Sequence, residues 1–234
     1  MSDRLLEDSF TAIGGRFVTP VDELCGKLEL CRAIVFDWDG VFNDGQKAPG
    51  AASGYSEADS MGTNMLRYGL WLRDGELPYT AIITGENNDG ATELAEREHL
   101  AAIYSGIRRK QDVITHLCAE NGLQPDQVAC VFDDINDLAM AESCGLRLVV
   151  RRDASPLFSD FVEREKLCDY LSGTHGGDNA VREICELLLG LMNCYADVVR
   201  SRVVFDEAYA NYFRTRQSVN TLAFMQEKAG ITAV

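Results

Sequence analysis

The chain of 234 residues lacks the features that mark several large protein classes. No apolar run reaches the roughly 18 to 20 residues of a membrane span, because the best stretch, residues 184–199, contains three polar side chains. No basic-then-apolar leader opens the chain, so we expect a cytoplasmic protein. Neither the G-x-x-x-x-G-K-[ST] pattern of P-loop enzymes nor the G-x-S-x-G pattern of serine hydrolases occurs, which excludes both chemistries.

Positive charge is also scarce, with 22 Lys and Arg against 37 Asp and Glu, a net charge of −15. A surface this acidic repels nucleic acid and anionic lipid, so we expect neither as a partner. The eight cysteines contain no C-x-x-C pair and the three histidines are scattered, which predicts reduced thiols without a zinc site. Apolar residues make up 46% of the chain, so we expect one globular domain with additions.

Short apolar runs alternate with longer amphipathic segments, the pattern of βα units around a parallel sheet. Buried strands are predicted at residues 33–36, 81–83, 101–104, 128–132 and 146–150, with helical spacing between them. Residues 44–56, rich in Gly, Ala and Ser, indicate a loop or a small β-hairpin flap. Residues 180–230 have a helical pattern throughout, including a segment over 205–225. We therefore predict an α/β fold with a doubly wound, Rossmann-like parallel sheet and a helical C-terminal extension.

Acidic side chains fall directly after two of the predicted strands. Asp37 and Asp39 follow the first strand, and Asp133 and Asp134 follow the fourth. Ligands of open parallel sheets bind beyond the carboxyl ends of the strands, so these four carboxylates are expected to converge. Like charges at close range need a counter-charge, and a hard divalent cation with oxygen ligands, most simply Mg²⁺, supplies it.

The ends of the other two strands carry groups that suit a phosphate. Thr84-Gly85 follows the second strand and offers a hydroxyl and a loop amide at a helix start. Lys110 follows the third strand, where an ammonium group neutralises phosphate charge. Each of these residues alone is more often a cap or a turn former, but together and in this order they favour a phosphate site.

These segments resemble the four motifs of the haloacid dehalogenase superfamily, namely Asp37-x-Asp39-Gly40-Val41, Thr84-Gly85, Lys110 and Asp133-Asp134-x-x-Asp137. Residues 176–183 resemble the Gly-Gly-x-x-Ala-Val-Arg-Glu segment of its 3-deoxy-manno-octulosonate 8-phosphate phosphatases. The resemblance implies a hydrolase domain over residues 18–191, between an N-terminal extension over 1–17 and a helical extension over 192–234.

The resemblance implies a magnesium-dependent phosphatase acting on a small phosphorylated metabolite. Asp37 is the expected nucleophile, which forms an aspartyl-phosphate, and Asp39 is the expected general acid and base. Asp37, Asp133 and the backbone carbonyl of Asp39 are the implied Mg²⁺ ligands. Asp134 and Asp137 are expected as supplementary ligands or as supports for the primary ones.

The spacing of the motifs leaves no room for a large cap domain. The segment from Thr84 to Lys110 holds one helix and one strand, and the segment from Asp39 to Thr84 holds only the weak hairpin and one helix. Capless relatives cover the site with a neighbouring subunit. The resemblance therefore implies a homo-oligomer, with a tetramer favoured.

Departures from the family pattern concern substrate choice. Glu86 stands where the second motif usually has Arg, and Ala58 stands where Arg usually precedes the acid at Asp59. These changes remove positive charge that would hold an anionic sugar acid. We therefore expect the octulosonate phosphate to be a poor substrate, with Glu86, Asp59 and Arg182 as candidate specificity residues.

Two other kinds of protein could carry the same residues. A signalling receiver domain also gathers acids, a Thr and a Lys around Mg²⁺, but its acid pair comes at the first strand and its phosphorylated Asp at the third. The order found here argues against it. A catalytically weakened relative that serves as a binding or assembly module stays open as the alternative, because the second motif and the hairpin are altered.

Overall fold

The computed structural model describes residues 3–47, 53–228 and 230–234. Its strands are β1 Arg16–Phe17, β2 Ala33–Asp37, β3 Tyr79–Ile83, β4 Ala102–Ser105, β5 Val128–Phe132, β6 Leu146–Arg151, β7 Tyr170–His175, β8 Leu222–Glu227 and β9 Gly230–Ala233. Its α-helices are α1 Asp3–Ala12, α2 Val21–Leu30, α3 Glu57–Asp74, α4 Asp89–Arg97, α5 Lys110–Asn121, α6 Leu138–Glu142, α7 Pro156–Arg164, α8 Ala180–Leu191, α9 Tyr195–Val204 and α10 Glu207–Gln217.

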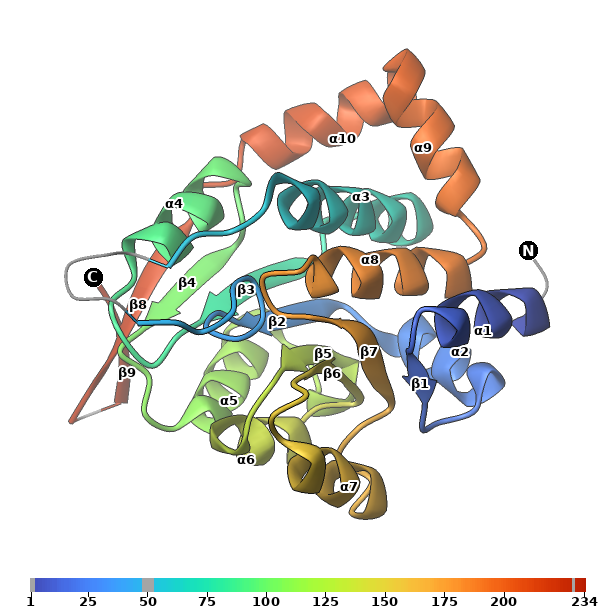
Figure 1. The fold of residues 1–234 in the computed structure, drawn as a ribbon. Helices are drawn as coiled ribbons and strands as arrows, with labels where there is room; N and C mark the ends of the chain where they lie inside the picture. The colour runs from blue at the N-terminus through green and yellow to red at the C-terminus, as the bar shows by residue number, and fades with distance from the viewer. Residues whose placement is uncertain (1–2, 48–52, 229) are drawn as a thin grey trace.

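All strands of the described residues join one sheet in the order β1-β7-β6-β5-β2-β3-β4-β8-β9. The pairs from β7 across to β8 are parallel, whereas β1 and β9 pair antiparallel at the two borders (Figure 1). The predicted parallel sheet flanked by helices is therefore confirmed. The five predicted strands correspond to β2 to β6.

Helices cover both faces of the sheet (Figure 1). They have to, because alternate side chains of β2 face opposite sides of the sheet and are buried on both. Ile34 and Phe36 belong to a buried cluster formed with α2, α3, α4 and α8. Ala33 and Val35 belong to a second buried cluster formed with α5, α6 and α7. With both faces buried, the strand ends at one edge become the place where polar groups reach solvent.

The prediction of a helical C-terminal extension is only partly right. Helices α9 and α10 form, but the helical segment expected over 205–225 ends at Gln217, and residues 222–227 form β8, parallel to β4. The ring of Phe224 stacks on Tyr104 with centroids 4.9 Å apart. Pairing with an open sheet edge thus overrides a weak helical pattern, which local sequence does not reveal.

The predicted hairpin flap is not supported. Residues 44–47 and 53–56 contain no strand, and the tip of the expected hairpin, residues 48–52, lies outside the described residues. Short segments rich in Gly, Ala and Ser have little side chain to pack across strands, so a loop is the simpler outcome.

Helix α10 lies beside α3 and is fixed there by buried polar contacts (Figure 1). Arg216 places Nη1 2.7 Å from Oε2 of Glu98 and 2.9 Å from Oδ1 of Asn64. The hydroxyl of Tyr212 donates to the same Asn64 oxygen at 2.8 Å. A buried ion pair with these supporting hydrogen bonds ties the extension to the body of the protein. None of the described helices has the length and apolar character to cross a membrane.

Candidate active site

A cavity of about 580 Å³ opens at the carboxyl ends of the central parallel strands. Its walls come from the segments that follow five successive strands, β2 to β6. The lining residues are Asp37, Asp39, Gly45, Lys47, Gly85, Glu86, Ile107, Arg108, Lys110, Asp133, Asp134, Asn136, Asp137 and Arg152. The predicted convergence of the strand ends is therefore what the structure contains.

Three buried carboxylates meet in this cavity. Asp37 is the last residue of β2, Asp133 follows β5, and Asp137 ends the short 3₁₀ turn after it. One carboxylate oxygen from each lies within 4.8 Å of the others. The acid that completes the group with Asp37 and Asp133 is thus Asp137, which the sequence suggested only as a supplementary ligand.

Lys110, the first residue of α5, provides the counter-charge inside the protein. Its Nζ donates to Oδ1 of Asp37 at 2.5 Å and also contacts Asp137. Burial alone would lower the pKa of Lys110, but the carboxylates of Asp37 and Asp137 outweigh burial and raise it. Lys110 is therefore a fixed positive charge beside the carboxylate of Asp37.

The remaining two acids of the triad carry pKa values far above the ordinary 3.8. Burial raises the pKa of Asp133 to about 7, helped by the charge of Asp37 and opposed by Arg152. Burial and Asp37 likewise raise the pKa of Asp137 to about 7, opposed by Lys110. These shifts show that the single lysine and arginine do not fully compensate the clustered negative charge.

A divalent cation fits this group of acids. Asp37 and Asp137 share the one ammonium group of Lys110, and Asp133 pairs with Arg152. Three clustered carboxylates form the all-oxygen environment that Mg²⁺ prefers. The acidic triad of Asp37, Asp133 and Asp137 can therefore hold a divalent metal ion.

Two of the predicted acids line the cavity outside the triad. Asp39 lines the cavity, but its carboxylate accepts from Nζ of Lys47 at 2.5 Å and from Oγ of Ser53 at 2.9 Å. Asp134 accepts from the backbone N–H of Ile135 at 2.7 Å and begins the 3₁₀ turn. Neither side chain belongs to the triad, so the capping role that single acids usually have applies to Asp134.

In the second motif, Thr84-Gly85, the loop contributes to the cavity wall more than the threonine hydroxyl does. Thr84 is buried at the end of β3 and does not line the cavity, whereas Gly85 and Glu86 do. The backbone of Thr84 donates to the carbonyl of Tyr104 and accepts from the N–H of Ile107. Thr84 thereby fixes the adjacent loops, and its hydroxyl accepts from the backbone N–H of Glu86 at 3.4 Å.

Asp59 and Arg182 do not line the cavity, contrary to the suggestion that they select substrate. Asp59 accepts from the backbone N–H of Arg182 at 2.8 Å and from the hydroxyl of Ser56, which joins the starts of α3 and α8. The guanidinium of Arg182 pairs with Glu186 one turn along α8. Within this chain their contacts are structural.

Sequence reasoning missed three cations of the cavity wall. Arg152, just after β6, pairs with Asp133, and Lys47 bridges Asp39 and Glu86. Arg108 is exposed at the rim. None of them lies in a recognisable motif. For Arg152, the position directly after a strand end was a sequence signal of a place in the site.

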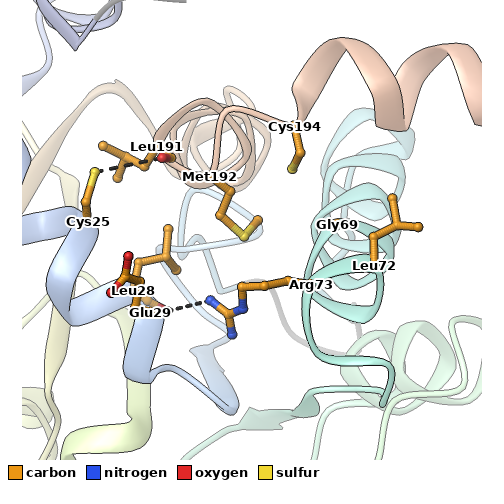
Figure 2. Close-up of a pocket in the computed structure, with 9 residues that line it drawn as sticks. All are labelled: Cys25, Leu28, Glu29, Gly69, Leu72, Arg73, Leu191, Met192 and Cys194. Atoms are coloured by element: carbon orange, nitrogen blue, oxygen red, sulfur yellow. Dashed lines mark hydrogen bonds between the residues drawn. The ribbon is translucent and has the colours of Figure 1, made fainter.

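A second cavity, of about 390 Å³, lies between α2, α3 and the end of α8 (Figure 2). Apolar groups such as Leu28 and Met192 dominate its walls. Its one guanidinium, from Arg73, donates to the carbonyls of Leu28 and Cys31 at 2.6 Å each and so caps α2. The guanidinium there is thus occupied in holding the fold.

Comparisons with known proteins agree with the geometry of the acidic cavity. No family model matches the chain. The 3-deoxy-D-manno-octulosonate 8-phosphate phosphatase of Escherichia coli K12 is 30% identical over 172 residues, which cover 71% of this chain and 84% of that protein. The phosphatase of the same name from Salmonella typhimurium is 30% identical over 165 residues, covering 70% and 81%. The chain belongs to the haloacid dehalogenase (HAD) superfamily.

Solved structures place the same fold in metal-binding HAD phosphatases. The Yersinia pestis phosphatase has a TM-score of 0.62 at 28% identity and covers 74% of this chain and 88% of its own. The Haemophilus influenzae phosphatase, in a cobalt-bound form, has a TM-score of 0.59 at 25% identity, covering 71% and 92%. The Moraxella catarrhalis structure contains magnesium and phosphate and shares the fold, with a TM-score of 0.64 at 24% identity over 77% and 98%. This HAD protein is accordingly a phosphoric monoester hydrolase.

Proposed function

We propose that the protein hydrolyses a small phosphomonoester, with Mg²⁺ as cofactor and Asp37 as nucleophile. The observation that carries the proposal is the contact of Lys110 with Asp37 beside Asp133 and Asp137, at the carboxyl edge of the sheet. Mg²⁺ bound by these acids, with the carbonyl of Asp39 as a further ligand, would offset the repulsion between an anionic nucleophile and an anionic phosphate.

Asp37 and Asp39 divide the reaction into two steps. A carboxylate oxygen of Asp37 attacks phosphorus, the ester P–O bond breaks, and Asp39 donates a proton to the departing alkoxide. Asp39 then takes a proton from water, whose oxygen attacks the aspartyl-phosphate, releases phosphate and restores the Asp37 carboxylate. The contact of Lys47 with Asp39 supports this role, because it keeps that carboxylate at the cavity wall. Lys110 and the Gly85 loop hold the phosphate oxygens.

The substrate is proposed to be a sugar phosphate or a similar small metabolite. Relatives are named for the octulosonate phosphate. In this chain Glu86 lies at the cavity wall, 3.2 Å from Nζ of Lys47. A carboxylate at this place favours hydroxyl groups over a second carboxylate in the substrate. We expect a lower kcat/KM for the octulosonate phosphate than for the phosphate of a sugar without a carboxylate. The reverse order would refute this proposed substrate class.

The site stands open on one side, with no cap domain inserted between the motifs in the described residues. We propose that a neighbouring subunit of a homotetramer covers it, because an exposed site admits water freely. Light scattering at micromolar concentration tests this, and a monomer would contradict it.

Hydrolysis of p-nitrophenyl phosphate with and without Mg²⁺ tests the proposed activity. We expect Asp37→Asn to lower kcat at least about 1,000-fold, because an amide cannot form the phosphoryl ester. Asp126→Asn is the matched control, since Asp126 is exposed in the turn before β5, at the opposite edge of the sheet. A wild-type protein without activity under any divalent metal would favour the alternative, a binding or assembly module derived from a HAD phosphatase.

A further inference from the structure

The C-terminal extension reaches the edge of the sheet at which the catalytic acids lie. Strand β8 runs parallel to β4, with Ser105 opposite Met225 (Figure 1). Gln226, the next residue of β8, is therefore placed just beyond the carboxyl end of β4. At this end the chain enters the loop 106–109, which leads into α5.

The side chain of Gln226 binds this loop at both of its functional atoms. Its Oε1 accepts from the backbone N–H of Arg108 at 2.8 Å and from that of Arg109 at 3.3 Å. Its Nε2 donates to Oδ2 of Asp112, in the first turn of α5, at 3.1 Å. Only a neutral amide offers an acceptor and a donor in this arrangement, so all three bonds require Gln rather than an acid or an apolar residue.

The loop that Gln226 holds carries Lys110. The loop begins at Gly106 with φ +65°, and a second tie joins the N–H of Ile107 to the carbonyl of Thr84 at 3.0 Å. Arg109 is the N-cap residue of α5 and makes no side-chain cap hydrogen bond, and its own N–H donates to Gln226. One residue later Lys110 extends into the cavity and meets Asp37 at 2.5 Å.

We propose that Gln226 is a positioning residue for Lys110, through which the C-terminal extension sets the geometry of the active site. The inference rests on the proposed function for its kinetic consequence.

Gln226→Met removes the polar atoms at nearly constant volume, and Glu227→Gln, at the exposed next residue, is the matched control. We expect Gln226→Met to lower kcat for p-nitrophenyl phosphate about 10-fold with KM within about twofold, since misplaced catalytic groups lose transition-state contacts first. A purely structural role would lower the melting temperature and leave kcat unchanged, and a direct role in binding would raise KM alone. Either pattern overturns the proposal.

A charge swap sharpens the test. Gln226→Glu keeps the acceptor but faces the Asp112 carboxylate, so it should lower kcat as Gln226→Met does. Adding Asp112→Asn supplies the missing donor from the other side, and the double variant should recover kcat to within about twofold of Asp112→Asn alone. No recovery overturns the proposed pairing.

Hydrogen exchange separates this inference from the proposed function. Loss of the Gln226 acceptor should speed exchange of the Arg108 and Arg109 amides about fivefold in Gln226→Met, with peptides from β5 unchanged. Unchanged exchange overturns the proposal whatever the activity. A wild-type protein that hydrolyses no phosphate ester refutes the proposed function, while the exchange comparison still decides whether Gln226 holds the loop.

Discussion

Binding of Mg²⁺ should stabilise the protein more at pH 8 than at pH 6. The reason is the state of the triad, because burial and the charge of Asp37 raise the pKa of Asp133 and of Asp137 from 3.8 to about 7. Between about pH 4 and pH 7 the metal-free folded protein therefore holds at least one proton on these two acids that the unfolded chain has released. Stability from this proton is present at low pH and is lost as pH rises from about 4 to about 7.

The size of the effect follows from these pKa values. One proton held in this way corresponds to about 4 kcal/mol, at 1.36 kcal/mol per pKa unit. At pH 8 the acids are ionised, and Mg²⁺ at 100 times its Kd adds about 2.7 kcal/mol. At pH 6 the ion must displace at least one proton, so its affinity falls at least about tenfold and the same concentration adds at most about half as much. The melting temperature should rise by about 2–4 °C per kcal/mol.

Thermal melts of EDTA-treated protein with and without Mg²⁺, at both pH values, measure this difference. Asp133→Asn should abolish the Mg²⁺-induced shift. Asp134→Asn, the neighbouring acid outside the triad, should retain it. Equal shifts at pH 6 and pH 8, or a full shift in Asp133→Asn, would refute the assignment of the cation to these carboxylates.

Two further predictions concern a buried ion pair and a glycine beside the acidic triad. Arg216→Met removes the buried cation 2.7 Å from Glu98 and leaves only Arg97, 3.7 Å away, so it should lower the free energy of unfolding by about 3 kcal/mol in urea titrations. Adding Glu98→Met should recover much of that loss, and no recovery would speak against a buried ion pair. Gly40→Ala should abolish the Mg²⁺-induced shift and lower kcat at least about 100-fold, because Gly40 has φ +86° and a Cβ there would overlap the carboxylate of Asp133. Retained activity would show that the loop can move aside.

The fold and the centre of the site could be predicted because each rests on a short-range pattern. Buried strands such as residues 128–132 are continuous apolar runs, and an acid directly after such a run is placed by the strand itself. Parallel pairing then brings Asp37 and Asp133 together without further information. The contact of Lys110 with Asp37 follows from the same rule.

What could not be predicted depends on contacts between distant segments. Strand β8 exists because the edge of β4 is open to it, and the six residues 222–227 carry no signal of that partner. The choice between Asp134 and Asp137 as the third acid depends on the 3₁₀ turn at 135–137, which brings Asp137 into the triad while Asp134 accepts from the N–H of Ile135. The positions of Asp59 and Arg182 likewise follow from the packing of α3 against α8.

The order of the strands assigns the two borders of the sheet to the two ends of the chain, β1 on one side and β8 with β9 on the other. The carboxylates of the triad lie at the ends of β2 and β5, two strands in the middle of the sheet. A change at β1 therefore alters only the periphery of the sheet, whereas a change at β8 also reaches the loop that carries Lys110. The two ends of the chain thus differ in how freely they can diverge while the chemistry is kept.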